Sequence, residues 1–137
     1  MAAGTDVNEQ ASPQQPLPAD VLIVEDNYII ALDLEDMLRG LGVARVRTAN
    51  SVLHALAMIA EGPPECGLID INLGAEKSFA VAERLRDLGI YFVFTTGYGD
   101  KYAFPEHFTD IGIVSKPYTL EAVSAAILRR GLPPPAA

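Results

Sequence analysis

Polar side chains that could do chemistry follow the apolar runs of this chain, at the positions where strands would end. Glu25 and Asp26 follow "VLIV", Asp70 lies within "CGLIDI", Thr96 ends "YFVFTT" and Lys116 follows "IGIVS". If these runs are parallel strands, their carboxyl ends meet at one edge of a sheet and the five side chains come within reach of one another. Carboxylates that close together repel unless a proton or a cation lies between them.

Three carboxylates, a hydroxyl and an ammonium group at one point would suit phosphoryl transfer. Hard oxygen ligands favour Mg²⁺, which keeps several waters and readily binds a phosphoryl oxygen. The lysine and the hydroxyl would hold the phosphoryl group, and an aspartate between them can be the nucleophile that forms an aspartyl phosphate. In the alternative, Asp70 caps a helix and Lys116 merely pairs with it, which leaves the other strand ends unexplained.

Apolar runs that alternate with amphipathic segments predict the elements that position these residues. The predicted strands are 21–24, 44–49, 66–71, 91–96 and 111–115. The predicted helices, each closed by a glycine in a left-handed cap, are 27–39, 51–60, 77–88 and 120–130. Residues 97–110 are rich in glycine and broken by Pro105, so they predict a short or mobile fourth crossover helix.

This alternation predicts an α/β fold, namely a flavodoxin-like (βα)5 doubly wound parallel sheet with strand order 2-1-3-4-5. In that order, ligands bind in the crevice beyond the carboxyl ends of strands 1 and 3. Residues 1–19 are rich in Pro, Gln and Ala without periodicity, and they predict a disordered lead-in. The domain would then span 20–131, followed by a proline-rich tail at 132–137.

The composition narrows the functional class. A chain of 137 residues can form one domain with a real hydrophobic core. The formal net charge of −8, from 18 acidic and 10 basic residues, argues against binding to nucleic acid. No apolar run approaches the ~20 residues of a membrane span, and no signal peptide is evident, so we expect a cytoplasmic protein without a membrane partner. The single cysteine, Cys66, excludes a disulfide framework within the chain.

The motifs "VLIVEDN", "LIDINL", "FTTGY" and "SKPY" occur in a familiar order and spacing. In them, residues 20–131 resemble the receiver domain of bacterial two-component response regulators. The resemblance implies that Asp70 is the phosphoacceptor, that Asp26 binds Mg²⁺ directly, and that Glu25 acts mainly through metal-bound water. The third protein ligand of the metal would be the backbone carbonyl of Asn72.

The same resemblance assigns the remaining site residues and a subgroup. Thr96 would hydrogen-bond the phosphoryl group and Lys116 would pair with it, aimed by a cis peptide bond to Pro117. "FTTGY" resembles the "FAT GUY" receivers, mostly stand-alone regulators of alphaproteobacteria, and "DINLG" followed directly by a helix matches them too. By analogy, the subgroup implies a histidine kinase of the HWE or HisKA2 type and a role in the general stress response.

The chain departs from the family at the position that usually switches. Ordinary receivers carry Tyr or Phe on the fifth strand, three residues before the lysine, and this chain has Ile113 there. Tyr98, two residues beyond Thr96, is the nearest aromatic that could move toward the phosphoryl group or shield it from water. In the alternative, Tyr98 is simply exposed on a glycine-rich loop.

We therefore expect a single-domain response regulator that accepts a phosphoryl group from a histidine kinase and signals by contact with a downstream protein. It would catalyse only its own phosphorylation and dephosphorylation, and so would not be an enzyme in the usual sense. Alternatively, it is a phosphate sink or shuttle that passes the group to a second receiver or a phosphotransfer protein.

Two other functional classes fit the residues less well. A phosphohydrolase that forms an aspartyl phosphate usually places a second acid two residues after the nucleophile, where this chain has Asn72. A flavodoxin-like cofactor binder would need a phosphate-binding turn after the first strand. That turn is "EDNY", without the glycine or the Ser/Thr cluster that such a turn requires.

Overall fold

A five-stranded parallel sheet forms the centre of the computed structural model, which describes residues 17–97 and 105–128. The strands of the sheet are β1 (Asp20–Val24), β2 (Arg45–Ala49), β3 (Cys66–Asp70), β6 (Tyr91–Thr96) and β7 (Ile113–Ser115). They lie in the order β2-β1-β3-β6-β7, and each neighbouring pair is parallel. The predicted fold class and strand order are confirmed, with β6 and β7 as the fourth and fifth strands.

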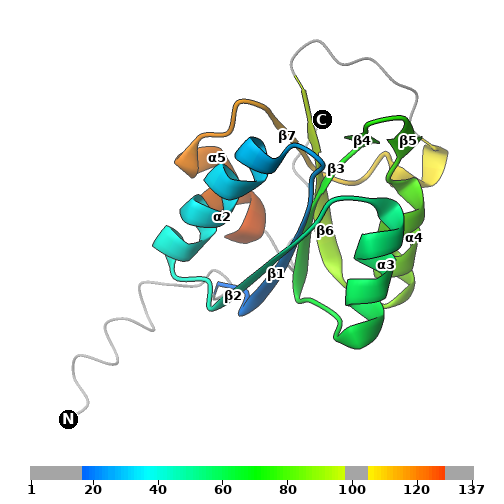
Figure 1. The fold of residues 1–137 in the computed structure, drawn as a ribbon, viewed down its shortest axis with the longest axis horizontal. Helices are drawn as coiled ribbons and strands as arrows, with labels where there is room; N and C mark the ends of the chain where they lie inside the picture. The colour runs from blue at the N-terminus through cyan, green and yellow to red at the C-terminus, as the bar shows by residue number, and fades with distance from the viewer. Residues whose placement is uncertain (1–16, 98–104, 129–137) are drawn as a thin grey trace.

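Helices cover both faces of the sheet. One face carries α2 (Tyr28–Leu41) and α5 (Leu120–Leu128), and the other carries α3 (Val52–Glu61) and α4 (Phe79–Asp87) (Figure 1). Because successive strand residues point to opposite faces, the apolar residues of β1 and β3 divide between two clusters, one under each helix pair. This two-sided burial explains the unbroken apolar runs in the sequence. Within the described ranges, no helix is long and apolar enough to cross a membrane.

Helix α2 ends at a different glycine from the one that the sequence predicts. The prediction that Gly40 closes the helix is wrong, because the helix continues to Leu41 and ends at Gly42, whose φ is 110°. The Val43 N–H donates to the Leu38 carbonyl at 3.1 Å, and the Val43 side chain is buried in the cluster under α2 and α5. Burial of Val43 against the core therefore selects the second glycine as the left-handed cap.

The other helix ends agree with the prediction only in part. Gly89 after α4 has a left-handed φ of 73°, as predicted. Gly62 after α3 does not, because its φ of −172° is extended. Helix α5 is described to Leu128, and the predicted last turn to residue 130 lies outside the described residues.

A short antiparallel hairpin, β4 (Asn72–Leu73) and β5 (Glu76–Lys77), separates β3 from α4. The prediction that "DINLG" leads directly into a helix starting at Lys77 is therefore wrong, because α4 begins at Phe79. The Lys77 ammonium group donates to the Asn72 side chain, and the Glu76 carboxylate accepts from the Val52 N–H at 3.2 Å. The first contact stabilises a hairpin where the sequence predicted the first turn of a helix. The second caps the start of α3.

The crossover between β6 and β7 is short where it is described. It contains one turn of 3-10 helix, η1 (Glu106–Phe108), while residues 98–104 lie outside the described part. Phe108 is 1% exposed and packs among three other phenylalanines on the α3–α4 side. Arg86 of α4 donates to the His107 carbonyl and to the Asp110 carboxylate, so α4 holds this crossover in position.

The packed part of the chain includes the last residues assigned to the lead-in. Leu17 packs against the cluster under α2 and α5, and the Ala19 N–H donates to the Glu65 carboxylate at 2.8 Å. Residues 1–16 and 132–137 lie outside the described residues. The predicted domain limits therefore stay a prediction.

Candidate functional site

The two adjacent acids that follow β1 have opposite environments. Glu25 is 2% exposed, its N–H continues the strand pairing to the Ala49 carbonyl at 3.0 Å, and its carboxylate accepts from the Asn27 N–H at 3.1 Å. Asp26, one residue on, is exposed. Because side chains alternate between the two faces of a sheet, Glu25 is buried on the α2–α5 side, whereas Asp26 is open to solvent.

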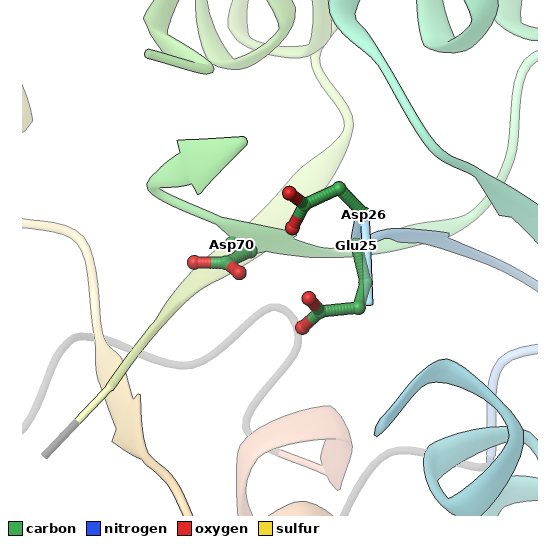
Figure 2. A group of neighbouring side chains, drawn as sticks. All are labelled: Glu25, Asp26 and Asp70. Carbon is green, nitrogen blue, oxygen red and sulfur yellow. The ribbon is translucent and has the colours of Figure 1, made fainter. Parts of the chain in front are cut away.

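Asp70 ends β3 beside these two acids. It is 4% exposed, and its Oδ1 accepts from the Asn72 N–H at 3.2 Å. One carboxylate oxygen from each of Glu25, Asp26 and Asp70 lies within 4.8 Å of the other two, and Figure 2 shows the three side chains directed toward one space. The convergence that the parallel topology predicts is thus present in the structure.

Lys116 completes this group from the end of β7. Its N–H donates to the Thr96 carbonyl at 2.8 Å, which extends the pairing of β6 and β7 to the lysine itself. Its Nζ lies 2.8 Å from Asp70 Oδ2 and 2.8 Å from Glu25 Oε1. The peptide bond from Lys116 to Pro117 is cis, as predicted.

The charges of the site are not balanced. Burial raises the pKa of Glu25 to about 7, and the contacts with Lys116 and the Asn27 N–H offset that effect only in part. Burial alone would lower the pKa of Lys116, but its contacts with Asp70 and Glu25 outweigh burial and raise that pKa above its ordinary value. The lysine therefore stays an ammonium group, and one positive charge faces three carboxylates.

The donor set fits a hard divalent cation. Three carboxylates around one space supply oxygen ligands, and Asp26 is open to solvent, so a bound ion could keep waters as Mg²⁺ requires. Glu25 Oε1 is buried and accepts no directed hydrogen bond within the described residues, although Lys116 lies beside it. A buried carboxylate oxygen in that condition is stabilised by further positive charge, which a metal ion would supply.

Thr96 takes a different position from the four charged groups. It is 7% exposed, and its hydroxyl donates to the Gly97 carbonyl at 3.0 Å. The strand register places Thr95, not Thr96, opposite Asp70. Thr96 thus lies at the same sheet edge, with its hydroxyl bonded to the backbone.

The structure does not test the predicted roles of two further site residues. The Asn72 N–H binds Asp70 and its side chain accepts from Lys77, while the role of its carbonyl stays a prediction. Tyr98, the predicted switch aromatic, lies outside the described residues. The hairpin brings Gly74 close to the site, because a Cβ added there would stand 3.6 Å from Asp26 Oδ2.

The sequence argument missed Tyr118, two residues beyond Lys116. A cavity of about 570 Å³ lies next to the site, and Tyr118 and Lys116 both line it, together with Ile29, Ile30, Asp33, Asp36, Gly97 and Pro117. Burial raises the pKa of the Tyr118 phenol to about 12. The signal in the sequence was its place in the motif "SKPY", directly after the predicted lysine.

Comparisons with known proteins agree on one family. Residues 21–128 match the family described as the response regulator receiver domain. The phyllosphere-induced regulator PhyR of Methylorubrum extorquens is 30% identical over 114 residues, which are 81% of this chain and 43% of that protein. This chain therefore spans less than half the length of that curated relative.

Two solved structures of SdrG are similar over nearly their whole length. The solution structure of SdrG from Sphingomonas melonis is 39% identical, with a TM-score of 0.72, and the match covers 82% of this chain and 95% of that one. The BeF3-activated conformation of SdrG, under Pseudomonas melonis, is 37% identical with the same coverage and a TM-score of 0.67. The present structure is thus more similar to the first of the two.

Proposed function

Since this chain belongs to the response regulator receiver domain family, we propose that it accepts a phosphoryl group on Asp70 from the phosphohistidine of a histidine kinase. Membership confirms the family that the sequence resembles. The observation that carries the proposal is the contact of Lys116 with the buried Asp70 carboxylate at 2.8 Å, beside two further acids. A buried aspartate held by an ammonium group beside a divalent-cation site is the arrangement that aspartyl phosphate formation needs.

The proposed step uses groups that this chain supplies itself. An Asp70 carboxylate oxygen forms a bond to phosphorus as the P–N bond of the phosphohistidine breaks, and the departing imidazole nitrogen takes a proton from solvent water. Asp26, Asp70 and the Asn72 carbonyl would hold Mg²⁺ directly, and Glu25 mainly through metal-bound water; the ion when bound supplies positive charge opposite the developing negative charge. Lys116 holds the phosphoryl oxygens from the other side.

The hydroxyl of Thr96 has a part in the same proposal. It now donates to the Gly97 carbonyl, and rotation about its side-chain bond would turn it toward a phosphoryl oxygen. The donor would be a kinase of the HWE or HisKA2 type, in keeping with the resemblance to the "FAT GUY" receivers. Because the reaction takes place on the chain's own side chain, turnover of an external substrate is not expected.

Output would come through contact with another protein. Ile113 at the start of β7 is 46% exposed and Leu120 at the start of α5 is 49% exposed, so apolar side chains face solvent on the elements that flank Lys116. A phosphoryl group that repositions Lys116 would shift the equilibrium between two arrangements of these elements. We propose that a downstream protein binds one of the two.

Mg²⁺-dependent labelling by a phosphohistidine kinase or a small phosphodonor tests the proposal. The wild-type chain should be labelled, and Asp70→Ala should abolish labelling, whereas Asp87→Ala, which changes an exposed acid at the end of α4, should retain it. Equal labelling of the Asp70→Ala chain would overturn the proposal. Return of the label to the kinase, or its passage to a second receiver, would instead favour a phosphate sink or shuttle.

A further inference from the structure

Tyr118 lies near the site both in the sequence and in the folded structure. It follows Lys116 by two residues in the loop between β7 and α5, and its ring packs against the apolar cluster under α2 and α5. Both residues line the same cavity. Tyr118 therefore packs against the core and also lines the cavity beside Lys116.

The Tyr118 hydroxyl is one of few buried polar groups without a well-formed hydrogen bond. Among the described residues, three buried side-chain atoms form no hydrogen bond of good geometry, namely Glu25 Oε1, which pairs with Lys116 at 2.8 Å, Tyr118 Oη and Ser78 Oγ. Two of the three thus belong to the region around Lys116. A buried O–H that donates to no acceptor is unfavourable in the resting structure, so its presence calls for an explanation.

The charged groups of the site act electrostatically on this hydroxyl. After burial, the influences on the pKa of Tyr118 come from the Thr95 side chain and from the charges of Lys116, Glu25 and Asp70. Thr95 is 3% exposed and lies opposite Asp70 in the strand register, and a hydrogen bond from its side chain to the phenol oxygen lowers the pKa of Tyr118. Among the described residues, the O–H of the phenol itself donates to no acceptor.

We infer that Tyr118 is a positioning residue whose hydroxyl donates to Glu25 Oε1 when Lys116 moves from that carboxylate to a phosphoryl group on Asp70. The inference rests on the proposed function, because it describes what the same site does once it is loaded. Lys116 now lies 2.8 Å from both Glu25 and Asp70. A phosphoryl group draws the ammonium toward its own oxygens, which takes the positive charge away from a carboxylate oxygen that accepts no other hydrogen bond among the described residues.

Donation from Tyr118 would hold the loaded site together in that state. A hydrogen bond to a charged group is stronger than one between neutral groups. In the resting form, the same O–H donates to no acceptor within the described residues. Tyr118 would thus favour the loaded form over the resting form.

Tyr118→Phe separates this role from packing, because it keeps the ring and removes only the hydroxyl. Tyr91→Phe is the matched control, since the Tyr91 hydroxyl donates to the Ala126 carbonyl at 2.7 Å and so bridges β6 to α5. We would measure thermal unfolding of the full chain without ligand. We would also measure the apparent Kd for BeF3⁻, a phosphoryl mimic, at saturating Mg²⁺ by amide NMR.

The two variants should behave in opposite ways. Tyr118→Phe should weaken BeF3⁻ binding about tenfold and leave thermal unfolding unchanged or slightly raised in temperature. Tyr91→Phe should lower the unfolding temperature and leave the Kd within about twofold. In the wild type, the Tyr118 ζ-carbon resonance should shift on addition of BeF3⁻, which a purely structural tyrosine would not show.

Two results would overturn the inference, and they are distinguishable. If the wild type binds BeF3⁻ and Tyr118→Phe binds it equally well, Tyr118 has no positioning role while the proposed function stands. If the wild type shows no Mg²⁺-dependent binding of BeF3⁻, the proposed function and the inference fall together.

Discussion

Strand β1 carries an acid paired with a base at each of its ends, and the two pairs differ in how completely they are satisfied. At the start of the strand, Arg47 donates from Nε and Nη2 to Asp20 Oδ1 at 3.2 and 3.0 Å, and from Nη2 to Oδ2 at 3.1 Å. It also donates to the carbonyls of Met58 and Gly62. The guanidinium group thus ties β1, β2 and the end of α3 together.

At the other end, the charges do not balance. Lys116 faces Glu25, Asp26 and Asp70 with a single positive charge. Glu25 Oε1 lacks a directed hydrogen bond within the described residues, and burial raises the pKa of its carboxyl to about 7. At the start of β1, which we call the closed end, every charge has its partners, and such a network stabilises the fold. At the other end of β1, the open end, negative charge is in excess, and such a site can bind a positively charged ligand.

The largest effect expected is at the closed end. Arg47→Met should lower the free energy of unfolding by about 3 kcal/mol, because it leaves the Asp20 carboxylate and two carbonyls without their donor. Urea unfolding measures this. Arg45→Met is the matched control, because Arg45 is 65% exposed and lies 3.9 Å from Asp20, so its loss should change stability by less than about 0.5 kcal/mol. Equal effects of the two variants would contradict the comparison.

At the open end, removal of a charge should raise the free energy of unfolding instead of lowering it. The pKa of Glu25 is raised from 4.5 to about 7 in the folded chain, so the folded chain binds the extra proton and loses stability as pH rises through that window. Glu25→Gln removes this titration. Without Mg²⁺, the variant should gain about 2 kcal/mol over the wild type between pH 4.5 and about pH 6.5.

The measurement is urea unfolding of the wild type and Glu25→Gln across that pH range in the presence of a chelator. Other carboxylates titrate in both chains, so the difference between the two isolates Glu25. A difference that stays constant with pH, or that favours the wild type at high pH, would show that the open end is as satisfied as the closed one.

The sequence predicted the parts of this comparison that follow from topology. Parallel strands must bring Glu25, Asp70 and Lys116 to one edge, and alternation of apolar runs and helices was enough to infer parallel strands. It could not predict the hairpin after Asn72, because the contacts of Lys77 and Glu76 that stabilise it join residues through space.

Other features depended on packing that no local pattern encodes. Periodicity allows α2 to end at either glycine of "RGLG", and only the burial of Val43 decides between them. The position of the Tyr118 hydroxyl likewise depends on how the loop after β7 lies against the core. The distinction between direct and indirect metal ligands came from the family and stays a prediction, since the structure shows only that Asp26 is exposed and Glu25 is buried.

The smallest expected effect separates the two acids within the open end. Asp26 is exposed and, among the described residues, has no ion pair with a basic side chain, whereas the Glu25 carboxylate is buried and already lies 2.8 Å from Lys116. A metal ion can therefore bind the Asp26 carboxylate without displacing Lys116. At pH 8, Asp26→Asn should weaken Mg²⁺ binding about tenfold, or about 1.4 kcal/mol, and Glu25→Gln about threefold.

Isothermal titration with Mg²⁺ on the wild type and both variants measures the asymmetry. Asp36→Asn, which neutralises an exposed acid of α2 outside the trio, corrects for the general loss of negative charge and should leave the Kd nearly unchanged. A larger loss from Glu25→Gln than from Asp26→Asn would reverse the assignment. The metal would then have to displace Lys116 from Glu25, and the buried acid, instead of the exposed one, would be its direct ligand.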